Sequence, residues 1–113
     1  MHTSNDGRAE RLAIWVRDMP LEDQLFITST TLMLGEINLR RNDLPFAIDE
    51  VALRELPDPR EAALLARTIS ANYAGLPPSP APDGVDEYWR ISNMTKVMAE
   101  TIERYHPPRE GSA

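Results

Sequence analysis

Side chains that could act as a general base or a metal ligand are few in this 113-residue sequence. Both histidines, His2 and His106, lie in terminal segments that we expect to hold no fixed geometry, and cysteine is absent. A nucleophile–histidine pair, a histidine metal site and thiolate chemistry therefore lack the residues they need. The five glycines form neither a dinucleotide fingerprint nor a phosphate-binding loop. We expect no catalytic site, no metal and no cofactor.

The acidic residues also give no general acid/base pair. They occur as sequence neighbours, and neighbouring helical positions point to different faces, so we expect solvated surface charge, with Glu87 as an acid at the rim of any interface. The three adjacent pairs are Glu22-Asp23, Asp49-Glu50 and Asp86-Glu87. The hydroxyl run at residues 28–31 (TSTT) predicts side-chain hydrogen bonds to the helix's own i−4 carbonyls rather than nucleophilic chemistry.

The charge of the chain argues against direct nucleic-acid binding. Net charge is −6, the acids are spread evenly, and no basic face is indicated of the kind that neutralises phosphates. No apolar run approaches the roughly 20 residues that a bilayer requires, and no leader pattern is visible. Absence of cysteine suits a reducing compartment. We therefore expect a cytoplasmic protein that does not bind membranes.

The elements that must position any site are organised around residues 20–41. Their apolar side chains fall on most of the circumference of a helix, which predicts a central helix buried by neighbours on several sides. The only strip without large apolar groups contains small and polar residues, and it either faces water or admits another helix. The apolar residues are Leu21, Leu25, Phe26, Ile27, Leu32, Met33, Leu34, Ile37 and Leu39; the strip is Gln24, Thr28, Thr31, Gly35 and Asn38.

Four further segments show helical periodicity and complete an all-α bundle. Asp58-Pro59 predicts a capped helix start, and Gly75 predicts a helix end in the left-handed conformation. We expect one domain over residues 1–113, with four to five helices, disorder at 1–7 and 106–113, and a proline-rich connection at 75–84. The further helices are predicted at residues 8–19, 46–56, 58–74 and 85–105.

The last predicted helix carries an apolar stripe five turns long, flanked by Trp89. Such a stripe suits a core or a partner, because methionine adapts to irregular surfaces and aromatic residues anchor interfaces. Since the central helix already supplies several apolar faces, we expect the stripe to be partly exposed and to support a homodimer. Its members are Tyr88, Ile91, Met94, Met98, Ile102 and Tyr105.

These patterns predict binding of another protein through apolar side chains. Trp15, which falls beside the stripe of its own helix, fits either the core or a partner contact. The candidate partner-binding residues are Trp15, Phe26, Tyr88, Trp89, Met94 and Met98.

The segments MPLEDQLFITSTTLMLGEINLRR (19–41) and YWRISNMTKVMAETIERY (88–105), joined by a proline-bearing connection, carry a family resemblance. In an acidic, cysteine-free chain of this size, they resemble the small all-helical quorum-sensing antiactivators of the QslA and TraM kind. The resemblance implies an all-α homodimer that binds a LuxR-type transcription activator and prevents its dimerisation on DNA. It rests on size, charge and helix order, so it assigns no functional residue. Two alternatives are an acidic export or assembly chaperone and a DNA-mimic inhibitor.

Overall fold

The computed structural model describes residues 15–108 of the chain. This part contains four complete helices: α2 (Leu21–Arg40), α3 (Glu50–Glu55), α4 (Pro59–Tyr73) and α5 (Glu87–Tyr105). The described residues form no strand, only an isolated bridge between Pro80 and Asp86. The all-α prediction is confirmed. No helix in the described range is both long and apolar enough to cross a bilayer.

The helix predicted for residues 8–19 falls largely outside the described residues. Residues 15 and 16 are helical, and Trp15, Val16 and Met19 are buried in the core. The side-chain amide of Gln24 donates a 2.8 Å hydrogen bond to the Met19 carbonyl. This contact fixes the entry of the chain into α2.

Local capping signals place the next two helices. The Asp58 carboxylate accepts a 2.9 Å hydrogen bond from the Arg60 amide, Pro59 opens α4, and Gly75 follows the helix with a φ of 78°. The shorter α3 begins at Glu50 rather than at residue 46, because Asp49 caps it by accepting from the Ala52 amide. Both helix starts are therefore set by an aspartate whose side chain satisfies a first-turn donor.

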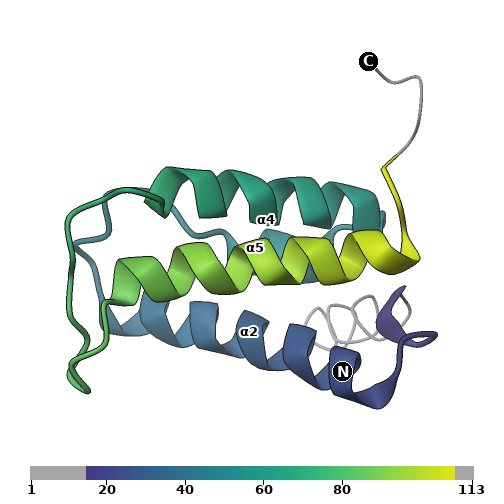
Figure 1. Ribbon diagram of the computed structural model, residues 1–113, viewed down its shortest axis with the longest axis horizontal. Coiled ribbons are helices and arrows are strands. Elements are labelled where there is room, and N and C mark those ends of the chain that lie inside the picture. Colours follow the sequence, from purple (N-terminus) through teal and green to yellow (C-terminus); the bar gives the residue numbers. More distant parts are fainter. Residues whose placement is uncertain (1–14, 109–113) are drawn as a thin grey trace, which may run out of the picture.

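The three long helices lie side by side, with α5 between α4 and α2 (Figure 1). The most extensive contact is between α4 and α5, and small residues of α4 allow their close approach. The Ser70 hydroxyl donates to the Ser92 carbonyl, and the Ser92 hydroxyl donates to the Ser70 carbonyl, at 2.8 and 2.9 Å. The core between the helices includes Ala62, Ala66, Ile69, Ile91, Met98 and Ile102.

The prediction that residues 20–41 form a helix buried on several sides is wrong for one side of α2. Ile27, Leu34 and Ile37 are buried against the other helices, whereas Leu21, Leu25, Leu32 and Leu39 are exposed. The helix in the middle of the molecule is α5 (Figure 1). The α2 helix contacts α5 and α3, and these two neighbours cover only part of its apolar circumference.

The proline-rich connection contains a tight turn stabilised by backbone hydrogen bonds. The Ala81 amide donates to the Val85 carbonyl at 2.7 Å, and the Glu87 amide donates to the Ser79 carbonyl at 2.8 Å. Gly84 has a φ of 85°, a conformation that side chains disfavour. The turn delivers the chain to Asp86, whose side chain caps α5 by accepting from the Tyr88 amide. The last helix therefore starts two residues later than Val85.

Candidate partner-binding site

The six residues predicted to bind a partner do not form one surface. Trp15 and Met98 are in the core, with exposed fractions of 6% and 0%. Phe26 and Tyr88 are partly buried against that core, and Met94 is half-buried. Only Trp89 is exposed, with 58% of its surface accessible. It is therefore the one residue of the six that presents most of its surface to a partner.

The apolar stripe of the last helix is mostly core rather than surplus surface. Ile91, Met98 and Ile102 have no exposed surface, because α5 lies between α4 and α2. At the end of this stripe, the Tyr105 hydroxyl donates to the Asp23 carboxylate at 2.6 Å, which joins the end of α5 to the start of α2. The expected exposed surface lies instead on α2.

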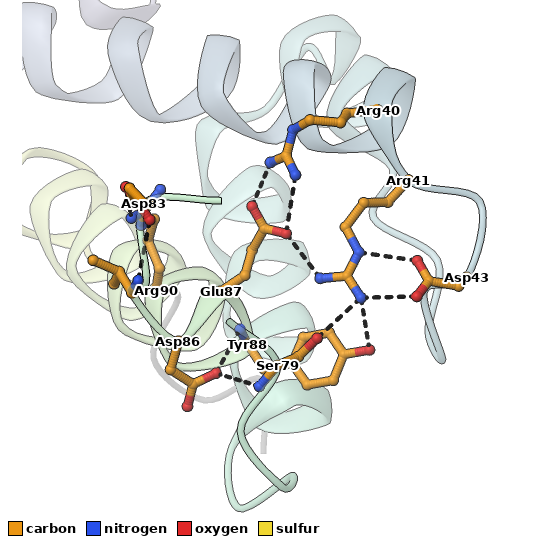
Figure 2. A network of polar contacts seen from close by, with 10 residues as sticks. Arg40, Arg41, Asp43, Ser79, Asp83, Asp86, Glu87, Tyr88 and Arg90 are labelled. Carbon is orange, nitrogen blue, oxygen red and sulfur yellow. Dashed lines mark hydrogen bonds and ion pairs between the residues drawn. The ribbon is translucent and has the colours of Figure 1, made fainter. Parts of the chain in front are cut away.

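The segment that carries Trp89 is fixed by a network of polar contacts around Glu87 (Figure 2). Glu87 has no exposed surface, and its carboxylate is paired with both Arg40 and Arg41 at the end of α2. The Arg41 Nη1–Glu87 Oε1 distance is 2.8 Å. The expectation that Glu87 is a solvated rim acid is wrong, because the first turn of α5 packs directly against the end of α2.

The two arginines keep the buried carboxylate charged. Burial by itself raises the pKa of Glu87, but hydrogen bonds from Arg40 and Arg41 outweigh burial and hold the pKa below its ordinary value. Hydrogen bonds to Asp43 and then to Glu87 raise the pKa of Arg41. The ion pairs of Glu87 thus attach the start of α5 to the end of α2, although Arg41 and Glu87 are 46 residues apart in the sequence.

Tyr88 forms the inner side of the same network. Its ring lies 5.2 Å below the Arg41 guanidinium carbon and packs edge-on against Tyr73, with 5.4 Å between ring centroids. Asp86 accepts from both the Ser79 and Tyr88 amides, at 3.0 and 3.1 Å. These contacts hold both residues that precede Trp89 along α5, so its backbone position is fixed.

The surroundings of Trp89 are half-apolar and half-charged. Val85, four residues earlier, is also exposed, and Arg90 donates to the Asp83 carboxylate at 2.8 Å. Asp86, one turn before Arg90, is instead engaged in capping the helix. An exposed indole at the fixed start of a helix, with a charged pair alongside, has the composition of an interface anchor with a polar rim.

The largest set of exposed apolar side chains lies on α2 and was missed as a surface. Leu21, Leu25, Leu32 and Leu39, which we call the leucine face, are 69%, 56%, 62% and 93% exposed. The apolar character of most of the helix circumference had predicted a core position for these leucines. Their spacing of four, seven and seven residues was the available signal, since it follows a heptad rather than a 3.6-residue period.

A recess between the start of α4 and the end of α5 offers little specific chemistry. About 260 Å³ lies between the start of α4 and the end of α5, bordered by Arg60, Glu61, Leu64, Glu103 and His106. Although disorder was predicted from residue 106, a His106 ring nitrogen lies 3.2 Å from the Trp15 carbonyl, and Arg60 donates to the Pro107 carbonyl. Across residues 15–108, no group of three or more acidic, histidine or cysteine side chains is placed to hold a metal ion.

Comparisons with protein-family models, curated proteins and solved structures found no match to this chain.

Proposed function

We propose that this protein acts without catalysis in the cytoplasm, by binding another protein in fixed stoichiometry as a small regulatory inhibitor of the antiactivator kind. The observation that carries the proposal is the exposed Trp89 at the fixed start of α5. Tryptophan is enriched among residues that dominate binding energy, because it buries a large rigid surface at little entropic cost. The proposed partner, as in the antiactivator resemblance, is a LuxR-type transcription activator.

The rigidity of the Trp89 segment supports this role. Glu87 and Tyr88 are held by Arg41, so little backbone ordering would be needed when a partner covers the indole. Binding then retains more of the energy of the contact, because the free protein already has the bound geometry. Arg90 and Asp83 beside the indole would form part of the polar rim.

The charge distribution favours this proposal over a DNA mimic. Several acids are paired with arginines of the same chain, rather than arrayed free on one face. Such intramolecular pairs are Glu87 with Arg40 and Arg41, Asp43 with Arg41, Asp83 with Arg90, and Glu103 with Arg67. An acidic surface that imitated DNA would need its carboxylates free to face the inhibited protein.

The test compares wild-type and Trp89→Ala proteins as baits on lysate of the source organism, with captured proteins identified by mass spectrometry. A regulator bound by the wild type and lost by the variant is then purified and titrated. We expect Trp89→Ala to weaken that complex about 30-fold, equivalent to about 2 kcal/mol. Leu64→Ala is the matched control, because Leu64 is comparably exposed on α4.

Helix content and melting of both variants should match the wild type, since neither side chain is buried. Equal affinity of the wild type and Trp89→Ala for every captured protein would contradict the role of Trp89. Inhibition of the activator is measured as loss of its complex with DNA on addition of equimolar protein. Retention of that complex would contradict the antiactivator part of the proposal.

A further inference from the structure

The leucine face forms a straight, exposed apolar line along α2. From Leu21 to Leu39 it extends about 27 Å at the helical rise. Thr28 and Gly35 lie on the same line, so that the complete stripe has spacings of four, three, four, three and four. This is the a/d pattern of a two-helix seam, whose average period of 3.5 residues keeps one face toward a partner helix.

The opposite side of α2 shows why this stripe is separate from the core. Ile27, Leu34 and Ile37 are fully or almost fully buried against the rest of the chain. At 100° per residue they lie across the helix from the leucine face. The helix therefore has one apolar side for its own core and a second apolar side that the described residues leave in contact with water.

We propose that the leucine face pairs with the same face of a second copy of this chain, as an antiparallel two-helix seam. We infer the antiparallel orientation from the sizes of the residues along the leucine face. In an antiparallel register, Leu32 lies opposite Thr28 of the second copy, Leu25 opposite its Gly35, and Leu39 opposite its Leu21. In the first two of these contacts a leucine faces a smaller residue, Thr28 or Gly35, which lets the side chains of the two helices interdigitate.

The surface around Gly35 can receive a leucine of the second copy. A groove of about 430 Å³ lies between α2 and α3, and its lining includes Leu32, Gly35, Leu39, Glu50 and Arg54. A side chain at position 35 would begin 3.3 Å from the Glu50 carboxyl carbon, so glycine lets the Glu50 side chain lie close to α2 as one wall of this groove. In the antiparallel register, Leu25 of the second copy lies over this groove.

The area of the face is enough for a specific dimer. Four leucines with these exposed fractions present on the order of 500 Å² of apolar surface per chain, near the upper end for a single patch on a monomer. Two such faces together give about 1,000 Å², which is the lower bound for a specific interface before the flanking residues are counted. A two-fold axis uses the same patch on both copies, so no second surface is needed.

The first test is the mass in solution, measured by light scattering at micromolar concentration. We expect about twice 12.7 kDa for the wild type and 12.7 kDa for Leu32→Glu. Leu64→Glu is the matched control, because Leu64 has nearly the same exposed fraction on α4, and it should remain dimeric. A dilution-independent monomer for the wild type would overturn the proposal, as would a dimer that persists in folded Leu32→Glu.

The second test determines the orientation of the two helices by cross-linking introduced cysteines. The natural chain has no cysteine, so an introduced one is the only thiol that can react. In the antiparallel seam, Ser29 lies close to Ser29 of the second copy near the two-fold axis, whereas the two copies of Glu22 are about 24 Å apart. A short bismaleimide should therefore join Ser29→Cys into a covalent dimer and leave Glu22→Cys monomeric. Cross-linking of both variants would overturn the antiparallel orientation in favour of a parallel one.

The acids beside the seam give a third test that strengthens the dimer. Glu22 and Glu36 flank the leucine face on one side, and the antiparallel register sets each opposite the other residue of the second copy. Glu36→Lys replaces two repulsive pairs by attractive ones, so we expect the dissociation constant of the dimer to fall about fivefold at low salt. An unchanged or weaker dimer would contradict this register.

The dimer is independent of the proposed function, and the variants separate the two. Trp89→Ala should remain dimeric, because Trp89 lies on α5 outside the leucine face. A monomeric wild type that still requires Trp89 for partner capture would refute the seam alone. A dimeric wild type whose partner binding ignores Trp89 would refute the Trp89 site alone.

Discussion

Glu87 is a buried charged residue whose substitution should lower the stability of the fold. Its carboxylate is fully buried, and both guanidinium groups that neutralise it lie at the end of α2, 47 and 46 residues earlier in the chain. Taking one member from a buried ion pair leaves the remaining charges without compensation. Here the arginines are partly exposed and can recover some hydration, so the loss is smaller than for a fully buried pair.

We expect Glu87→Gln to lower the free energy of unfolding by about 2 kcal/mol, measured by urea denaturation at pH 7. Asp83→Asn is the control, because the Asp83–Arg90 pair has a similar length but its carboxylate side is 58% exposed. That control should change stability by less than about 0.5 kcal/mol. Equal effects of the two substitutions would show that the Glu87 network contributes no more than a surface pair.

The pH dependence of stability follows from the direction of the Glu87 pKa. Its folded pKa lies below the ordinary value of 4.5, so its contribution is fully present above that pH and is lost as pH falls through the folded value. The pKa values of Asp43, Asp83, Asp86 and Glu103 are lowered as well, so they add to the same trend.

We therefore expect the wild type to become less stable as pH falls below about 4.5, with a weaker dependence in Glu87→Gln. Urea midpoints at pH 7, 4.5 and about 3 check this expectation. Parallel curves for the two proteins would mean that Glu87 has the same pKa in the folded and unfolded chains.

At the scale of elements, the contact between α4 and α5 depends on small side chains. Ala66 of α4 has no exposed surface. One turn later, Ser70 of α4 and Ser92 of α5 join the two helices through reciprocal hydrogen bonds. Ala66→Leu adds a branched side chain to this closely packed interface. We expect a loss of about 2 kcal/mol, seen as a lower urea midpoint with an unchanged slope. Ala71→Leu, at an exposed position of α4, should leave the midpoint near the wild-type value.

Elements with local signals could be predicted from the sequence. Asp58, Pro59 and Gly75 define the ends of α4 through contacts within a few residues, so no tertiary information was needed. The all-α class followed from periodicity. In the hydroxyl run at residues 28–31, Thr28 and Thr31 bond to their i−4 carbonyls as predicted, at 2.8 Å each, whereas the buried Thr30 hydroxyl has no hydrogen-bond partner among the described residues.

Features that depend on distant contacts could not be predicted. In α2, every large arc is apolar, so periodicity could not tell which arc faces the core. Glu87 looked like surface charge because its arginine partners lie 46 and 47 residues away. Within the candidate site, Trp89 is exposed and Met98 is buried, although both are large apolar residues of the same helix.

At the scale of the whole molecule, two separate exposed apolar places of the described residues are our candidate interfaces. One is a single indole on α5, held by the Glu87 network, and the other is the leucine face on α2. A molecule with these two places can pair with itself through one and keep the other available. The two-fold axis of the proposed seam would give the dimer two equivalent copies of Trp89.

The proposed seam makes thermal stability depend on protein concentration. If the folded dimer unfolds to separate chains, each tenfold increase in concentration favours the folded state by about 1.4 kcal/mol per dimer. For two chains of this length, that raises the melting temperature by about 3 °C. The melting temperature of Leu32→Glu should not change with concentration, while Leu64→Glu should follow the wild type. A wild-type melting temperature that stays constant across a hundredfold dilution would mean that the leucine face remains in water, and the free energy of unfolding would then come from the single chain alone.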